Sequence, residues 1–292
     1  MPCSPVTLSI ATIAAVISVA LLSIAFSTDN WVRISVDRNA LQLNLTQMRN
    51  RATQRGETLD PELEKLEADN NILAFTRTKG LFRICFPEQR PKGADLYRSP
   101  VETYCKNIDY YLSGESTGHF SENTMSWLHM GRSMIAMFII AFFFNFIAFW
   151  TGVAGCWRRS PGNITATALL MLLSCLFSAG GMGLWHGVEF FEREKLTDPE
   201  FYKQWPEMLQ HASHYDYDWS YMIAWIGVGW ALMASILFSG AAICLRNERE
   251  KEEALNMQYL MPVYPQKQQY AYGYAYPGPY YPGTQPYPPY NY

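Results

Sequence analysis

Four apolar runs without a charged residue constrain this 292-residue chain more than any other feature. They extend over residues 6–27, 133–157, 164–185 and 221–245. About 20 consecutive apolar residues are enough for an α-helix to cross the hydrocarbon core of a bilayer. Four soluble core helices, each uncharged for more than five turns, would be the alternative, and it is disfavoured. The sequence therefore predicts an all-α transmembrane four-helix bundle.

Basic residues indicate the orientation of these helices. The link between the second and third runs, residues 158–163, contains Arg158 and Arg159, and further basic residues follow the fourth run. Short loops rich in Lys and Arg stay in the cytoplasm. We therefore expect the amino terminus (residues 1–5), this link and the tail (residues 246–292) to be cytoplasmic, and residues 28–132 and 186–220 to be extracellular. A cleaved signal peptide is the competing interpretation of the first run. That run exceeds the roughly 7–15 apolar residues of such peptides, and no basic residue precedes it.

The first outer segment contains two cysteines, Cys85 and Cys105. In the oxidising surroundings outside the cell, a disulfide between them is the expected state. It would close a loop of about twenty residues, which chain entropy values at about 3 kcal/mol. Two unpaired thiols in a loop would be the alternative.

The outer segments show local patterns of both helix and strand. We expect a helical insertion over residues 39–71, with Leu41, Leu45 and Met48 on one face and a second helix capped by Asp60. Residues 76–111 are rich in aromatic and β-branched residues interrupted by prolines, which predicts short strands and turns. In the second outer segment, a helix is expected to start at Asp198. Phe201, Trp205, Met208 and Leu209 would lie along one side of it.

Few residues indicate a chemical site. Asn44-Leu45-Thr46 is a glycosylation sequon that faces the lumen in this topology. His211, His214, Asp216 and Asp218 could bind a metal, but no second cluster completes a tetrahedral site, so a solvated loop is expected and no metal. Asn145 lies within the second run, where an interhelical hydrogen bond would account for it.

Catalytic motifs for phosphate, metal or nucleophile chemistry do not occur in the sequence, so no enzyme and no cofactor are expected. Cys3, Cys156 and Cys244 lie where palmitoylation can occur, although buried thiols are equally plausible. The formal net charge of −3 gives no general attraction to nucleic acid.

Tyrosine and proline dominate the tail, whose composition predicts disorder. Two P-x-x-P spacings could bind SH3 or WW domains, and phosphorylated tyrosines could bind SH2 domains. The last three residues have the loose form of a PDZ ligand. A flexible tail without a dedicated partner is the alternative.

The spans and one set of outer-loop residues together resemble the claudin, peripheral myelin protein and calcium-channel gamma-subunit superfamily. Its first outer loop carries the pattern W…GLW…C…C. The matching residues here are Trp31, Gly80, Leu81, Phe82, Cys85 and Cys105, with Phe82 in place of the usual Trp. The stretches 105–109 and 217–220 resemble the stargazin-like branch more closely, and the resemblance covers about residues 6–245.

This resemblance implies a bundle topped by a small extracellular antiparallel β-sheet, in which a Cys85–Cys105 bridge would join two strands. Trp31, Leu81 and Phe82 would anchor the sheet to the bundle, although the position of Trp31 just beyond the first run would also suit the lipid headgroups. The implied function is non-catalytic binding of membrane proteins in the plasma membrane, at cell contacts or synapses. The protein would act either as an accessory subunit of a channel or receptor, or as an adhesion or junction-organising protein that binds claudin-like partners in cis or in trans.

Overall fold

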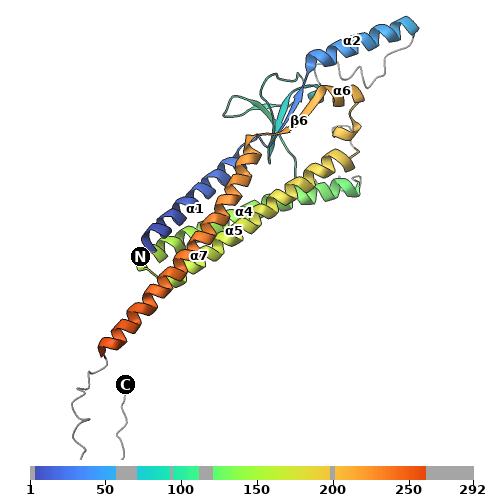
Figure 1. Cartoon of the computed structure of the whole chain (residues 1–292). Coiled ribbons are helices and arrows are strands. Elements are labelled where there is room, and N and C mark those ends of the chain that lie inside the picture. Colours follow the sequence, from blue (N-terminus) through green and yellow to red (C-terminus); the bar gives the residue numbers. More distant parts are fainter. Residues whose placement is uncertain (1–3, 57–70, 93–94, 112–120, 198–200, 261–292) are drawn as a thin grey trace, which may run out of the picture. The chain divides into compact units, whose positions relative to one another are not determined.

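The structure is a computed structural model that describes residues 4–56, 71–92, 95–111, 121–197 and 201–260. The chain divides into two compact units, residues 1–247 and 248–292. The first unit contains a bundle of long helices and a β-sheet (Figure 1). The expected helix start at Asp60, the expected start at Asp198 and the Tyr/Pro-rich tail beyond Leu260 lie outside the described residues.

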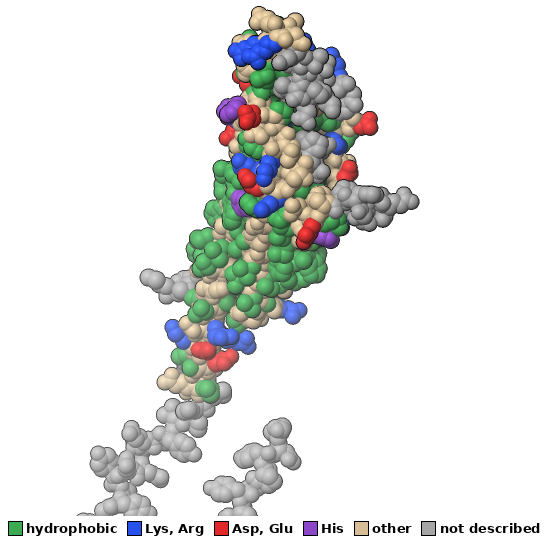
Figure 2. All heavy atoms as spheres, turned by 90° about the vertical axis from the view of Figure 1, so that its right-hand side faces the viewer, with side chains coloured by type: hydrophobic (Ala, Val, Ile, Leu, Met, Phe, Trp, Pro, Cys, Tyr) green, Lys and Arg blue, Asp and Glu red, His purple; other side chains and the backbone are tan. Residues whose placement is uncertain are grey.

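Within the described residues, four helices are long and apolar enough to cross a membrane, and they contain the four predicted runs. They are α1 (Ser4–Ser27), α4 (Glu122–Arg158), α5 (Pro161–Phe190) and α7 (Trp219–Leu260). On the face shown in Figure 2, hydrophobic side chains cover the middle of the helical part, and charged side chains gather over the sheet and at the opposite end of the helices. This distribution is the one expected of a multi-pass membrane protein.

The helices extend beyond the apolar runs because capping residues set their ends. α4 begins well before Ser133, where the Ser121 hydroxyl accepts a hydrogen bond from the Thr124 amide. It ends at Arg159, which adopts a left-handed conformation with φ of 47°. α5 then begins with Pro161 at its first turn, a position that requires no amide donor.

The sheet has six antiparallel strands in the order β4-β5-β3-β2-β1-β6. Strands β2 (Arg77–Lys79), β3 (Arg83–Phe86), β4 (Tyr97–Arg98) and β5 (Tyr104–Asn107) lie in the segment predicted to form strands. The sequence did not predict β1 (Val32–Val36) or β6 (Ser213–Tyr217). β6 comes from the second outer segment and pairs with β1 along its length, so both outer segments build one sheet.

The first part of the predicted helical insertion is a helix in the structure. α2 (Arg38–Arg55) begins after Asp37, whose carboxylate accepts a hydrogen bond from the Ala40 amide, and ends at Gly56 in a left-handed conformation. Leu41 and Leu45 are buried as expected, but Met48 is 42% exposed. The packed face of α2 therefore covers only its first two turns.

The second outer segment also departs from the prediction. A five-residue π-helical turn, η3 (Phe191–Lys195), extends α5, and a short 3₁₀ turn, η4 (Tyr202–Gln204), follows. The chain is extended at Trp205, and α6 (Glu207–Ala212) begins only after Pro206. A residue before proline is disfavoured in the helical region, which explains why the predicted continuous helix is wrong here. His214 and Asp216 lie in strand β6, so the expected loop is wrong there, although both side chains are exposed to solvent as expected.

Candidate functional site

The candidate site is the junction at which the sheet meets the end of the bundle, and Trp31 lies at its centre. The Trp31 side chain is fully buried, and its indole Nε1 donates a hydrogen bond of 2.8 Å to the Ala25 carbonyl. Its ring lies 5.0 Å from the Trp185 ring and 6.0 Å from the Phe138 ring, centroid to centroid. Contact of the indole with lipid headgroups is therefore excluded, and that interpretation of Trp31 is wrong.

The backbone of Trp31 joins three segments that are distant in sequence. Its amide donates to the Lys79 carbonyl at 3.1 Å, and its carbonyl accepts from the Asp218 amide at 3.0 Å. These bonds continue the pairing of β1 with β2 on one side and with β6 on the other. The residue thus connects the end of α1, both outer segments and the interior of the bundle.

Gly80, Leu81 and Phe82 form the turn between β2 and β3 and pack against the same region. A Cβ atom at Gly80 would lie 2.6 Å from the Asp29 Cα, so this close approach of two backbones requires glycine. Leu81 is fully buried, and its carbonyl accepts a hydrogen bond from the Tyr110 hydroxyl at 2.8 Å. Phe82 meets the Phe26 ring edge to face, with centroids 5.1 Å apart.

Cys85 and Cys105 are joined by a disulfide. They face each other directly in the register of β3 and β5, and both are buried. β4 contacts the rest of the sheet through β5. The bridge therefore attaches this outer half of the sheet covalently to the half that lies against the bundle.

Ion pairs link the sheet to the helix ends. Arg83 of β3 binds both carboxylate oxygens of Asp29, through Nε at 3.1 Å and Nη2 at 2.7 Å. Burial raises the pKa of the Asp29 carboxyl above its ordinary value, although the Arg83 guanidinium opposes this rise. Lys79 of β2 forms an ion pair with Glu192, which also accepts a hydrogen bond of 2.9 Å from the Trp127 indole.

Glu189 forms a second polar contact between α5 and the sheet. Its Oε2 accepts a hydrogen bond of 2.7 Å from the Tyr217 hydroxyl at the end of β6. Burial, followed by this bond to the carboxylate, raises the pKa of the Tyr217 phenol, which stays protonated at neutral pH. The sequence reasoning missed Asp29, Arg83, Glu189 and Glu192. The position of the three acidic residues close to the ends of apolar runs is the sequence signal that could have identified them.

The other predicted site residues lie apart from this junction. Asn44 is exposed on α2, and the Thr46 hydroxyl of its sequon donates to the Gln42 carbonyl within the same helix. In the part of the chain that the structure describes, no three His, Cys, Asp or Glu side chains are grouped so that they could hold a metal ion. The junction thus consists of packed side chains, ion pairs and a disulfide. These interactions suit a role in holding the surface of the sheet in place on the bundle.

Comparison with family models matches residues 16–240 to the family described as PMP-22/EMP/MP20/Claudin tight junction. The match includes residues 16–27 of the first apolar run, the second and third runs completely, residues 221–240 of the fourth, and all six residues of the outer-loop pattern. A comparison with curated proteins returns no match.

The first prediction concerns the disulfide. Cys85→Ser or Cys105→Ser removes a cross-link that chain entropy values at about 3 kcal/mol, so we expect the variants to be retained in the secretory pathway. Surface biotinylation measures this, with Cys175→Ser as a control that leaves the pair intact. Normal surface delivery of both variants would contradict a structural role for the bridge.

The second prediction separates the two contributions of Trp31. Trp31→Ala removes a fully buried aromatic ring and should lower stability by about 3–5 kcal/mol. Trp31→Phe keeps a ring but loses the hydrogen bond to Ala25, so it should cost only about 1 kcal/mol. Thermal unfolding of the detergent-purified protein measures both, and Trp157→Ala, at an exposed position, is the control. Equal effects of the Ala variants at positions 31 and 157 would contradict the proposed anchor.

Proposed function

Because the chain belongs to the PMP-22/EMP/MP20/claudin family, we propose that it binds other membrane proteins without catalysis, as an accessory or modulatory subunit of a channel or receptor in the plasma membrane. The observation that carries this proposal is the buried junction around Trp31. It fixes the sheet on the bundle. The protein therefore presents two preformed surfaces, one on the helices within the membrane and one on the sheet outside the membrane. Preformed surfaces bind with a smaller loss of conformational freedom.

The proposed orientation places the sheet outside the cell and both chain ends in the cytoplasm. The disulfide between Cys85 and Cys105 supports it, since such bonds form and persist in the secretory lumen and outside the cell. Arg158, the last residue of α4, and Arg159, which follows it before α5, support it independently. With this orientation Asn44 would be available for glycosylation.

The exposed face of α7 supports lateral binding in the membrane. One row of its exposed residues alternates at spacings of four and three, which is the pattern of helices that interlock side chains. The row consists of Met222, Ile226, Gly229, Met233, Ile236, Gly240 and Ile243, and Trp225, Trp230 and Leu232 are exposed beside it. Apart from the backbone of its own helix and its chain neighbours, a Cβ built at Gly229 or Gly240 would meet no described atom within 4 Å. Small residues let a partner helix approach closely, and packing drives association in lipid.

Cell–cell adhesion or junction organisation is the second candidate function. It is favoured by α2, which extends from the sheet with Leu43 and Met48 exposed (Figure 1). Such a helix, outside the cell, could contact a protein on an apposed membrane. The two functions differ in whether the partner is in the same membrane or in another.

The third prediction tests lateral binding. Gly229→Leu together with Gly240→Leu fills the open positions on α7 and should reduce recovery of membrane partners at least fivefold. Affinity purification from native membranes with quantitative mass spectrometry measures this. Gly183→Leu on α5 is the matched control, since a Cβ there also meets no described atom within 4 Å.

Localisation distinguishes the two functions in the same cells. Puncta that co-purify with a channel or receptor support the accessory role. Continuous lines at apposed membranes, with recovery unchanged in the α7 variant, would contradict lateral binding and favour adhesion.

A further inference from the structure

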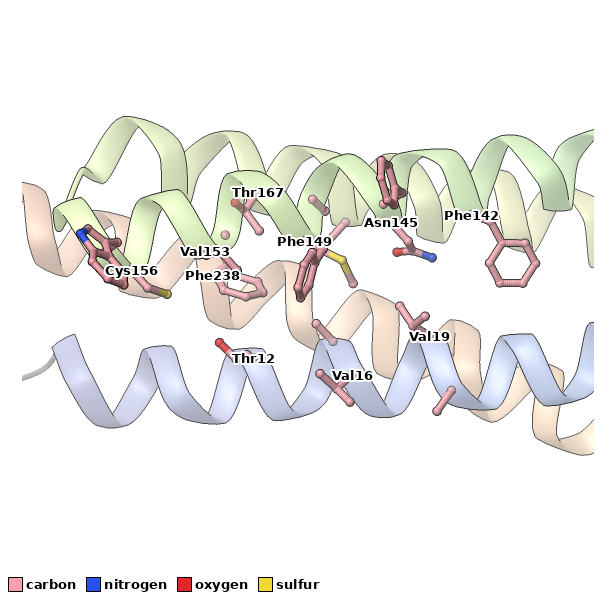
Figure 3. A pocket seen from close by; sticks show the side chains of 17 residues that line it. Thr12, Val16, Val19, Phe142, Asn145, Phe149, Val153, Cys156, Thr167 and Phe238 are labelled. Atoms are coloured by element: carbon pink, nitrogen blue, oxygen red, sulfur yellow. The ribbon is translucent and has the colours of Figure 1, made fainter.

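A deep apolar groove lies between α1 and α4, in the part of the bundle away from the sheet (Figure 3). Its volume is about 890 Å³. Val16 and Val19 of α1 form one wall, Phe142 and Phe149 of α4 form the other, and Phe238 of α7 contributes from behind. Because these helices cross the membrane, the groove opens toward the hydrocarbon and its occupant must come from the bilayer.

Asn145 has an unmet hydrogen-bonding requirement in this groove. Its side chain extends from α4 into the space between the helices (Figure 3), yet the residue is only 6% exposed. Neither Nδ2 nor Oδ1 has a hydrogen-bond partner among the described residues. The expected interhelical hydrogen bond is therefore absent there, and that interpretation of Asn145 is wrong. A buried amide without a partner is destabilising, and hydrocarbon offers no water to supply one.

Two threonine side chains that line the groove already have hydrogen-bond partners on their own helices. The Thr12 hydroxyl donates to the Leu8 carbonyl and the Thr167 hydroxyl donates to the Asn163 carbonyl, both at 2.9 Å. None of the residues that line the groove carries a charge. An ionic headgroup would be unpaired there, so the chemistry selects a ligand with an apolar body and a neutral hydroxyl or carbonyl group.

The shape of the groove favours a long, flat ligand. Its lining on α4 runs from Phe142 to Trp157, a rise of roughly 22 Å at 1.5 Å per residue. Aromatic side chains on one wall and small or β-branched side chains on the other suit a flat, rigid ring system, which loses little conformational freedom on binding.

We propose that the groove between α1 and α4 binds a membrane sterol, with its ring system between the two walls and its hydroxyl hydrogen-bonded to the Asn145 amide. A hydroxyl can donate to Oδ1 or accept from Nδ2, so it meets the requirement of either amide atom. This site is separate from the exposed face of α7 and does not depend on the proposed partner binding.

Photolabelling of the purified full-length protein tests the proposal. The protein is reconstituted in phosphatidylcholine vesicles with a photoreactive cholesterol analogue, and labelled peptides are mapped by mass spectrometry. We expect saturable labelling of α1 and α4 that excess cholesterol removes and added phosphatidylcholine does not. Cholesterol should also raise the unfolding temperature of the wild-type protein, since a ligand of the folded state stabilises it.

Two pairs of variants locate the site. Asn145→Leu keeps a side chain of similar size but removes the amide, and should reduce saturable labelling at least fivefold and abolish the thermal shift. Ser174→Ala, which removes another buried polar group that has no partner among the described residues and is not part of the groove lining, should change neither. Val16→Trp fills the groove and should block labelling, whereas Ile226→Trp, at an exposed position on α7, should not.

Three results of these experiments would each overturn a part of the proposal or all of it. Undiminished labelling in Asn145→Leu would overturn the assigned hydrogen bond, and undiminished labelling in Val16→Trp would overturn the groove as the site. Competition by phosphatidylcholine equal to that by cholesterol would show a general lipid surface and would also overturn the proposal.

Discussion

The burial of Trp31 between the sheet and the helix ends is the interaction on which the rest of the structure depends. The indole is in contact with Trp185 and Phe138 of the bundle, while the backbone of the same residue is bonded into the sheet. The strands bonded to the Trp31 backbone and the helices that contact its indole are therefore held at a fixed distance from one another. Gly80 permits the necessary backbone approach, and the pair Asp29–Arg83 closes the junction beside it. The disulfide extends this rigidity to the outer strands.

Much of this architecture could be predicted because its physical signals are local. Uncharged runs of about twenty residues predicted the four helices, and two cysteines in one outer segment predicted the pair that the structure joins. Strand β6 could not be predicted in this way. Its residues, Ser-His-Tyr-Asp-Tyr, include types that strands disfavour, and only pairing with β1 makes them a strand. The position of β6 follows from its pairing with β1, which lies far from it in the sequence.

The errors at individual residues have the same origin. Trp31 was compatible with a headgroup position because sequence shows adjacency to a span, whereas its burial depends on the sheet that folds over it. Pro206 interrupts a helix whose apolar pattern continues through it, so periodicity alone gave the wrong element. The amide of Asn145 was expected to be satisfied by a neighbouring helix, and only the positions of α1 and α4 reveal that it meets a groove. Local sequence patterns thus identified most helices and strands, whereas the roles of individual residues depend on how these elements pack.

A bundle with a fixed sheet can bind partners with two kinds of surface, the lipid-facing helices and the exposed sheet with α2. The central claim is that the junction around Trp31 holds these parts together as one rigid unit. Hydrogen–deuterium exchange of the protein in lipid nanodiscs tests it most directly. We expect the amides of β1, β2 and β3 to exchange as slowly as those in the middle of α5, and Trp31→Ala to accelerate their exchange without affecting α5. Exchange of these strands within seconds in the wild-type protein would contradict it.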